Sequence, residues 1–233
     1  MPYKSQTRFI TSIRSVERDN ITSIILAAGA GYRMKSYGPK CLLRVGEKTI
    51  IEHQIHNIRT VMPKGDIIVS LGFECDRVMR HLPLEVRVVE NQLHEETNTA
   101  ESLRLSINNG IRSGVLVIHG DLVFNTETLS SCDYTESFIL YDTKDQFKES
   151  EVGVTVNKGL ATRMGYGLKD KWAQISYFTG KELKLLRSVC KNRERSRMYT
   201  FEIINEVLDS GGQLRAVEPE DMQIKDIDSS KDL

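Results

Sequence analysis

The feature that most constrains this chain is an apolar strand that runs directly into a short glycine loop. Residues 21–28 read Ile-Thr-Ser-Ile-Ile-Leu-Ala-Ala, which predicts a buried strand, and Gly29 and Gly31 follow it at a spacing of two. Glycines let a backbone turn tightly and bring its N–H groups close to a ligand. Arg33 and Lys40 follow within the same loop, and their charges neutralise anions. A strand that ends in such a loop predicts a polyphosphate site.

The composition argues against several other kinds of anion-binding protein. The 32 basic and 32 acidic residues of the 233-residue chain cancel, so no global positive field recruits nucleic acid or an anionic membrane. No apolar run approaches the roughly 20 residues of a membrane helix, and the first 20 residues lack the apolar stretch of a signal peptide. The four cysteines form no CxxC pair, which favours reduced thiols in a cytoplasmic protein. We therefore expect a cytoplasmic protein with no membrane insertion and no nucleic-acid partner.

Strand-like and helix-like segments alternate along the first half of the chain. Hydrophobic periodicity predicts strands at 21–28, 67–71, 86–89 and 115–119, and helices at 50–62 and 98–111. Asn98 is expected to cap the second helix, with Glu101 completing a capping box. This rhythm predicts βαβ units in a parallel sheet, whose ligands bind beyond the carboxyl ends of the strands. The loop at 29–40 and Asp121 both follow strands directly, so we expect them at the same edge of the sheet.

The second half of the chain is less regular. Strands are predicted at 138–141, 152–156 and 172–178, and helices at 181–190 and 199–208. Because no internal repeat or low-complexity linker interrupts the chain, residues 21–233 are interpreted as one domain that follows an N-terminal extension, residues 1–20. Residues 8–14 of that extension either add a strand or stay flexible.

The glycine loop itself fits some nucleotide-binding motifs and not others. No Gly-Lys-Ser/Thr follows it at the distance that a P-loop requires. It begins like the dinucleotide fingerprint, but Met34 stands where the third glycine should be. The longer pattern Leu26-Ala-Ala-Gly-x-Gly-x-Arg-Met followed by Pro39-Lys40-x-Leu-Leu resembles the signature of nucleotidyltransferases of the GT-A-like fold. That family includes sugar-phosphate nucleotidylyltransferases and small cytidylyltransferases.

Three further segments resemble landmarks of this family, in the family's order. The segment from Thr97 to Leu103 is similar to one that contacts the nucleobase, particularly in phosphocholine cytidylyltransferase-like members. His119-Gly120-Asp121 resembles the Gly-Asp metal site, and residues 226–233 resemble a C-terminal Asp-Ile-Asp-Thr-Pro-Glu-Asp-Leu element. Ser230 replaces the usual proline, which leaves the second metal ligand less defined than the first. The resemblance implies a Rossmann-like three-layer α/β/α fold with a mostly parallel mixed sheet.

The resemblance also implies a role for each matching residue. Arg33, Lys40 and Asp121 would be catalytic, and Asp121 with Asp226 or Asp228 would hold Mg²⁺, a hard cation that takes carboxylate and phosphate oxygens. The nucleoside triphosphate would contact Leu26, Ala27, Ala28, Gly29, Ala30, Gly31, Arg33, Asn98, Ser102 and Asp121. A phosphate monoester would attack the α-phosphorus and release pyrophosphate. Because anions repel one another, positioning and charge neutralisation should dominate catalysis.

The acceptor substrate is less constrained than the reaction. The resemblance near Thr97–Leu103 favours CTP with a phosphocholine-like acceptor, and a sugar 1-phosphate is nearly as well supported. A cationic head group would want an aromatic cage, for which the available side chains are Tyr141, Trp172, Tyr177 and Phe178. The expected partners are therefore a nucleoside triphosphate and a small phosphorylated acceptor, and the sequence leaves a homo-oligomer open.

Two other functions remain as alternatives. A catalytically silent homologue would bind nucleotide as a sensor or scaffold. A dinucleotide-dependent oxidoreductase would use the Gly-x-Gly pattern as half a fingerprint, although Met34 and the basic Arg33 argue against it.

Overall fold

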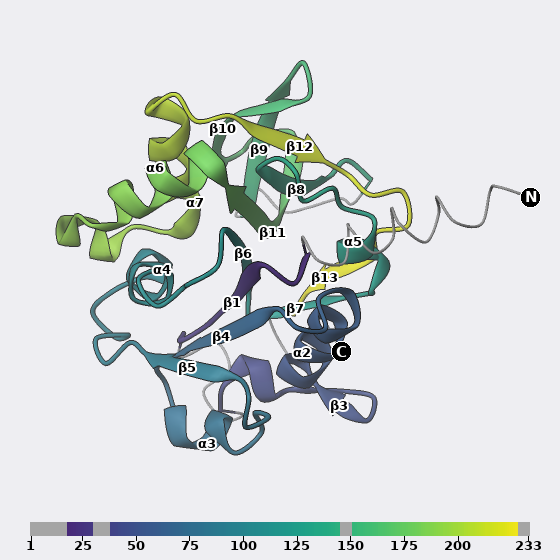
Figure 1. The fold of residues 1–233 in the computed structure, drawn as a ribbon, viewed down its shortest axis with the longest axis vertical. Helices are drawn as coiled ribbons and strands as arrows, with labels where there is room; N and C mark the ends of the chain where they lie inside the picture. Colours follow the sequence, from purple (N-terminus) through teal and green to yellow (C-terminus); the bar gives the residue numbers. More distant parts are fainter. Residues whose placement is uncertain (1–17, 30–37, 145–150, 228–233) are drawn as a thin grey trace, which may run out of the picture.

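The computed structural model describes residues 18–29, 38–144 and 151–227, and the description below refers to these ranges. Its centre is a nine-stranded mixed sheet in the order β5-β4-β1-β6-β11-β8-β12-β10-β9 (Figure 1). The strands are β1 (Ile21–Ala27), β4 (Asp66–Leu71), β5 (Arg87–Glu90), β6 (Gly114–His119), β8 (Phe138–Asp142), β9 (Val152–Asn157), β10 (Leu160–Tyr166), β11 (Asp170–Thr179) and β12 (Leu214–Val217). Two small sheets pair β7 (Leu122–Phe124) with β13 (Ile224–Asp226), and β2 (Arg44–Val45) with β3 (Lys48–Thr49).

The large sheet changes character at β6. Strand β1 pairs in parallel with β4 and β6, and β4 pairs in parallel with β5. Beyond β6, strand β11 runs antiparallel to both β6 and β8. Because Ile175 lies opposite Ile118, the first residues of β11 reach the edge where β6 ends. That edge carries the residues that matter below.

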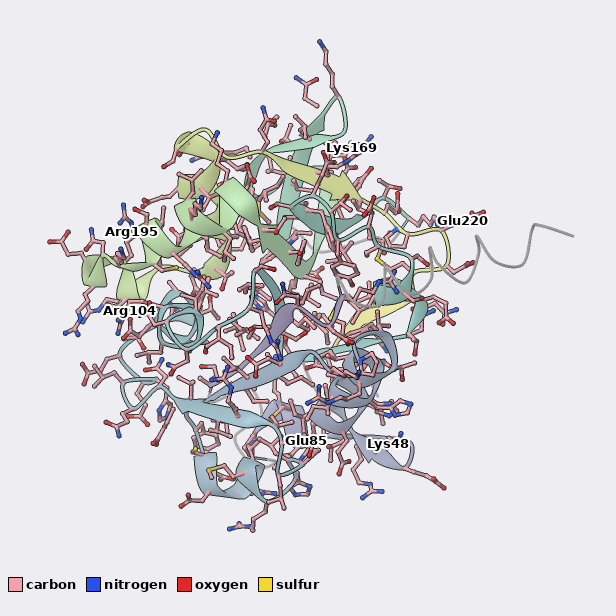
Figure 2. All side chains as sticks on the ribbon, in the orientation of Figure 1. Lys48, Glu85, Arg104, Lys169, Arg195 and Glu220 are labelled. Carbon is pink, nitrogen blue, oxygen red and sulfur yellow. The ribbon has the colours of Figure 1, made fainter. Side chains whose placement is uncertain are left out.

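Helices cover both faces of the sheet and bury two separate cores. One face packs against α2 (Ile50–Val61), α3 (Cys75–Met79) and α5 (Glu127–Ser130), and the other against α4 (Thr99–Ile107), α6 (Gly180–Cys190) and α7 (Thr200–Asp209). Along β1, Ile25 joins the first core while Ile24 and Leu26 join the second, as the two-residue period of a strand requires. The charged side chains of Arg195, Lys169 and Glu220 lie at the rim of the molecule (Figure 2). The predicted α/β/α fold is confirmed.

Most predicted elements form close to their expected bounds, but α4 is shorter than predicted and is capped differently. It ends at Ile107, and Ile111 is 77% exposed, because Asn-Asn-Gly at 108–110 is a poor helix-forming sequence. Asn98 occupies the N-cap position without a side-chain cap hydrogen bond. The predicted capping box is wrong because the Glu101 carboxylate accepts from Arg104 Nε at 2.7 Å instead.

The four cysteines are free thiols. Burial raises the pKa of Cys41, Cys132 and Cys190 to about 12 in each case. Since the thiolate is the nucleophilic form, these three side chains are unreactive at neutral pH. All three pack in the hydrophobic cores.

Two expectations from the sequence lie partly or wholly outside this description. Residues 8–14, with their two alternatives, fall outside the described residues. Within the described part of the chain, no helix has the length and apolar character needed to cross a membrane. The cytoplasmic location and the division at residue 20 stay predictions.

Candidate active site

Asp121 is brought to the end of β1 by a glycine that permits a very close approach of two strands. The Gly120 N–H donates to the Leu26 carbonyl oxygen at 2.9 Å. A Cβ at Gly120 would lie 2.8 Å from both the Ala27 Cβ and that same oxygen, which no side chain tolerates. The Gly-Asp pair therefore fits here for a steric reason, and it places a carboxylate beside the strand that enters the glycine loop.

Lys40, the last residue of the loop at 29–40, lies close to Asp121. Lys40 begins the short 3-10 helix η2 (Lys40–Leu42), directly after the buried Pro39. Its Nζ atom lies 3.4 Å from Asp121 Oδ2, and both side chains are mostly shielded from solvent. The segments after β1 and β6 thus converge at one edge of the sheet, as the alternation of strands and helices predicts.

Asp226 joins the same place from a segment far downstream. Strand β13 pairs antiparallel with β7, so that Asp226 lies opposite Leu122. The Ile227 N–H donates to the Asp121 carbonyl oxygen at 3.0 Å. These backbone contacts bring the two aspartates onto neighbouring chain segments.

Gln174 fixes the Asp226 carboxylate, and sequence reasoning missed it. Its Nε2 atom donates to Asp226 Oδ2 at 2.8 Å. Gln174 has a φ of 57°, in the left-handed region, where the pairing of β11 with β8 shifts register between Trp172 and Ser176. Bulges of this kind re-aim side chains, and residues held in sparsely populated backbone regions cluster at functional sites. Nothing in the apolar run 172–178 marks the glutamine in advance, because register shifts depend on the partner strand.

The two aspartates suit a magnesium ion chemically. Carboxylate oxygens are the donors that Mg²⁺ prefers, and Mg²⁺ at a phosphate site is held by one or two carboxylates, substrate oxygens and water. Within the described ranges, no group of three or more His, Cys, Asp or Glu side chains has metal-binding geometry. Asp121 and Asp226 are the two carboxylates on neighbouring segments that could serve as donors to such an ion, while Asp228 lies outside the described residues.

The other residues predicted to hold the triphosphate divide into two groups. Leu26, Ala27 and Ala28 form the end of β1 and the residue after it, and a Cβ on Gly29 would find open space within 4 Å. Ala30, Gly31 and Arg33 lie outside the described residues. The nucleotide-binding roles of both groups stay predictions.

Asn98 and Ser102, which are predicted to bind nucleotide, make structural contacts. The Asn98 amide donates to the Arg197 carbonyl oxygen at 3.1 Å. Ser102 is buried, and its hydroxyl accepts from the Asn91 amide at 3.2 Å. The same Asn91 amide donates to Thr97 at 3.0 Å, so this buried asparagine, which the sequence did not single out, organises the whole segment.

A cavity of about 340 Å³ opens beside Asp226 and Gln174. Its other lining residues come from α4, β6, β9, β10, β11 and α7 with their flanks, and they are Thr99, His119, Glu151, Val152, Tyr166, Lys171, Trp172, Tyr199, Thr200 and Phe201. Tyr199 stacks on Phe201 with ring centroids 5.9 Å apart, and Tyr166 meets Phe201 edge-on at 5.4 Å. The cavity therefore has aromatic walls and is also lined by Asp226.

These walls differ from the predicted aromatic cage. Trp172 lines the cavity, but Tyr177 and Phe178 are buried in the two cores on opposite faces of the sheet. Tyr141 packs against the second core. Tyr177 and Phe178 are therefore core residues rather than members of a cage, and they enter different cores because successive residues of a strand point to opposite faces. Tyr166, Tyr199 and Phe201 replace them, from segments that the sequence did not place together.

The electrostatics of the cavity are nearly balanced. Lys171 Nζ lies 2.9 Å from Glu151 Oε1. Burial lowers the pKa of His119, with Asp121 opposing the shift, so the imidazole is neutral at neutral pH. His119 also meets Trp172 edge-on with ring centroids 5.3 Å apart.

Comparison with known proteins relates part of the chain to a known domain family. The model of the MobA-like NTP transferase domain matches residues 23–132. This match covers a little under half of the chain. The predicted relationship to nucleotidyltransferases is confirmed, and the match supports the prediction of a nucleotidyltransferase enzyme. The matched segment contains Lys40 and Asp121, while Asp226 and most of the residues that line the cavity lie beyond it.

Individual relatives are similar over different lengths. The bifunctional protein GlmU of Synechococcus sp. (strain JA-3-3Ab) is 32% identical over 117 residues, which are 49% of this chain and 18% of the relative. The chain therefore spans under a fifth of that relative's length. The CTP:phosphocholine cytidylyltransferase of Streptococcus pneumoniae has the same fold, with a TM-score of 0.75, 21% identity, and coverage of 91% of this chain and 95% of that one. The inositol-1-phosphate CTP transferase of T. maritima also has this fold, with a TM-score of 0.73 and 21% sequence identity over 91% of each chain.

Proposed function

We propose that this protein is a Mg²⁺-dependent nucleotidyltransferase that transfers a nucleoside monophosphate from a nucleoside triphosphate to a small phosphomonoester. The observation that carries the proposal is the contact of Lys40 with Asp121 at 3.4 Å, at the end of the strand that enters the glycine loop. A cation and a carboxylate at that point suit a triphosphate and its metal ion.

The reaction needs positioning more than proton transfer. A phosphate oxygen of the acceptor attacks the α-phosphorus of the triphosphate and forms a new P–O bond. The bond from the α-phosphorus to the oxygen that bridges to the β-phosphorus breaks, and pyrophosphate leaves with that electron pair. Because the acceptor oxygen is already anionic at neutral pH, no general base is required. Lys40 would reduce the repulsion between the two phosphates by lying next to both.

Asp121 and Asp226 would hold the magnesium ion, and Gln174 would keep the Asp226 carboxylate in position. The bound ion would neutralise charge on the phosphate oxygens during transfer. Arg33 and the backbone at 29–31 would hold the remaining triphosphate charge, as the resemblance implies. Since partners of metal ligands fix ligand orientation, Gln174 belongs to this site although it does not itself bind metal.

We propose CTP as the nucleotide and leave two acceptor classes, phosphocholine-like compounds and sugar 1-phosphates. Both structural neighbours described above are named for CTP, which supports this choice. One is named for phosphocholine and the other for inositol-1-phosphate, so the fold itself does not select the acceptor.

The direct test is release of pyrophosphate from each of the four nucleoside triphosphates, with a panel of phosphomonoesters as acceptors. We expect turnover with CTP and one acceptor class, loss of that turnover when EDTA removes divalent cations, and recovery when Mg²⁺ is added back. Nucleotide binding by calorimetry that is indifferent to Mg²⁺, with no pyrophosphate from any pair, would contradict the proposal and favour a silent homologue.

A further inference from the structure

A buried glutamine on α2 spans the turn that carries Asp121. This turn, residues 120–121, joins β6 to β7. The Nε2 atom of Gln54 donates to the His119 carbonyl oxygen at 2.9 Å and to the Leu122 carbonyl oxygen at 2.8 Å. These two carbonyls belong to the residues directly before and after the turn. One amide group, on a side chain that is only 1% exposed, therefore holds both ends of the turn.

The amide of Gln54 makes these bonds at the expense of its own oxygen. Nε2 must face the two carbonyls, because Oε1 in its place would set one acceptor against two others. Oε1 is then buried, and it has no hydrogen-bond partner within the described ranges. A buried, unpaired acceptor lowers stability, and an apolar side chain of the same size would avoid that loss. Since sequences depart from such rules mainly at functional sites, the bonds to the turn indicate a function.

Helix α2 is a rigid support for this contact, because one of its faces is buried in the first core. Its N-terminus is also tied to the segment that follows Lys40, since the Ile50 N–H donates to the Leu43 carbonyl oxygen at 2.9 Å. One helix therefore contacts the segment that begins with Lys40 and, through Gln54, the turn that carries Asp121.

We infer that Gln54 is a positioning residue, which keeps the Asp121 carboxylate where it would meet Lys40 and hold the magnesium ion. This inference rests on the proposed function and adds to it a residue that acts only through Asp121. The other hydrogen bonds described above for this turn, with Leu26 and with Ile227, join backbone to backbone. Gln54 thus makes the support that a substitution can remove. A small displacement of a group that holds a metal ion or substrate is enough to weaken its action.

Asn57 offers a matched comparison one turn further along α2. Its amide is also buried, and it donates to the Phe124 carbonyl oxygen at 2.6 Å. Phe124 is the last residue of β7, so this bond supports the strand and not the turn. Loss of either amide should lower stability, but only loss of the Gln54 amide should disturb Asp121.

The test measures how much Mg²⁺ strengthens nucleotide binding. The probe is a CTP analogue with a methylene bridge between the α- and β-phosphorus, so that no transfer occurs. It is titrated into the protein by calorimetry, once with Mg²⁺ and once with EDTA. The ratio of the two Kd values isolates the contribution of the metal ion without any turnover, and binding in EDTA verifies that each variant is folded.

Gln54→Met keeps the length of the side chain without its donors. The ratio should fall by about tenfold or more in this variant, while the Kd in EDTA stays within twofold. Gln54→Glu has the shape of the glutamine but turns acceptors toward the two carbonyls, so its ratio should fall at least as far. Asn57→Leu is the control. It should keep the ratio within twofold of the wild type, although its melting temperature falls.

The outcomes distinguish this inference from the function on which it rests. An unchanged ratio in both Gln54 variants, with wild-type binding that depends on Mg²⁺, would overturn the inference and leave the nucleotidyltransferase intact. Equal falls in Gln54→Met and Asn57→Leu would overturn it too, because the effect would then follow stability. Wild-type binding that is indifferent to Mg²⁺, with no pyrophosphate release from any substrate pair, would instead remove the proposed function itself.

Discussion

The two halves of the large sheet hold their site residues by different means. In the parallel half, formed by β5, β4, β1 and β6, strands end at a common edge, so the segments after β1 and β6 bring Lys40 and Asp121 within 3.4 Å. In the other half, β11 runs antiparallel and begins at that edge. There a register shift and a left-handed residue, Gln174, aim a side chain at Asp226. Regular strand geometry positions the residues of the first half, and a local irregularity positions Gln174 in the second.

The difference separates the residues proposed for the triphosphate from those that line the cavity. The MobA-like NTP transferase domain match ends at residue 132, so it covers the parallel half and the residues proposed for the triphosphate. Most of the cavity lies beyond that point. We expect changes in the strands beyond β6 to alter this cavity, the proposed acceptor site, without moving Lys40 or Asp121, whereas changes in the parallel half should affect every substrate pair.

The largest expected effect tests the parallel half. Lys40→Ala and Asp121→Ala should each lower kcat/KM by about 10²–10³-fold, the usual cost of removing one preorganised charge contact. The loss should be similar for every acceptor, as steady-state pyrophosphate release measures. Lys48→Ala, at an exposed position on β3, is the matched control and should stay within about twofold. If either variant lost activity with one acceptor class and kept it with another, the division between the halves would fail.

A smaller effect tests the irregularity at β11. In Gln174→Asn, asparagine tolerates a positive φ, but its amide is too short to reach Asp226. The Mg²⁺ concentration needed for half-maximal rate should therefore rise by about 10–100-fold, the usual cost of losing the hydrogen-bond partner of a metal ligand. The measurement is the Mg²⁺ concentration that gives half-maximal rate. Thermal unfolding in the absence of metal should change little. An unaltered Mg²⁺ requirement would mean that Gln174 does not position a metal ligand.

The last prediction concerns folding and tests how tightly β1 packs against the segment that follows β6. Gly120→Ala places a Cβ 2.8 Å from Ala27 Cβ and from backbone, which should cost about 1–3 kcal/mol of stability. For a chain of this size each kcal/mol lowers Tm by roughly 2–4 °C. Gly165→Ala in β10 is the control, since its nearest neighbour outside adjacent residues lies at 4.0 Å. Equal melting temperatures for the two variants would show that β1 and β6 can separate without cost.

The same contrast explains which parts of the molecule the sequence could predict. The parallel half was predictable because each buried strand is an apolar run, and each amphipathic helix repeats its apolar residues at helical spacing, as Ile51, Ile55 and Ile58 do. The positions of Lys40 and Asp121 followed, because parallel strands end together. Asp226 was identified only through the family resemblance.

The rest depends on contacts that no local pattern records. Strands β7 and β13 have three residues each, too few for a periodicity to show. The bend at Gln174 arises from pairing with β8, and the cavity gathers Thr99, Glu151 and Phe201 from distant segments. The predicted capping box at Asn98 failed because Arg104 offered Glu101 a charged partner one turn away.

Because β13 pairs with β7, the proposed site is completed by a segment that lies far downstream of Lys40 and Asp121 in the sequence. A chain emerges from the ribosome with its N-terminal part first, so β1, Lys40 and Asp121 are available long before residues 224–226 are made. The parallel half can collapse around its own core in that interval, but Asp226 is still missing. The nascent chain would therefore fold early and acquire its second carboxylate late, when β13 adds to β7 and the Ile227 N–H reaches the Asp121 carbonyl.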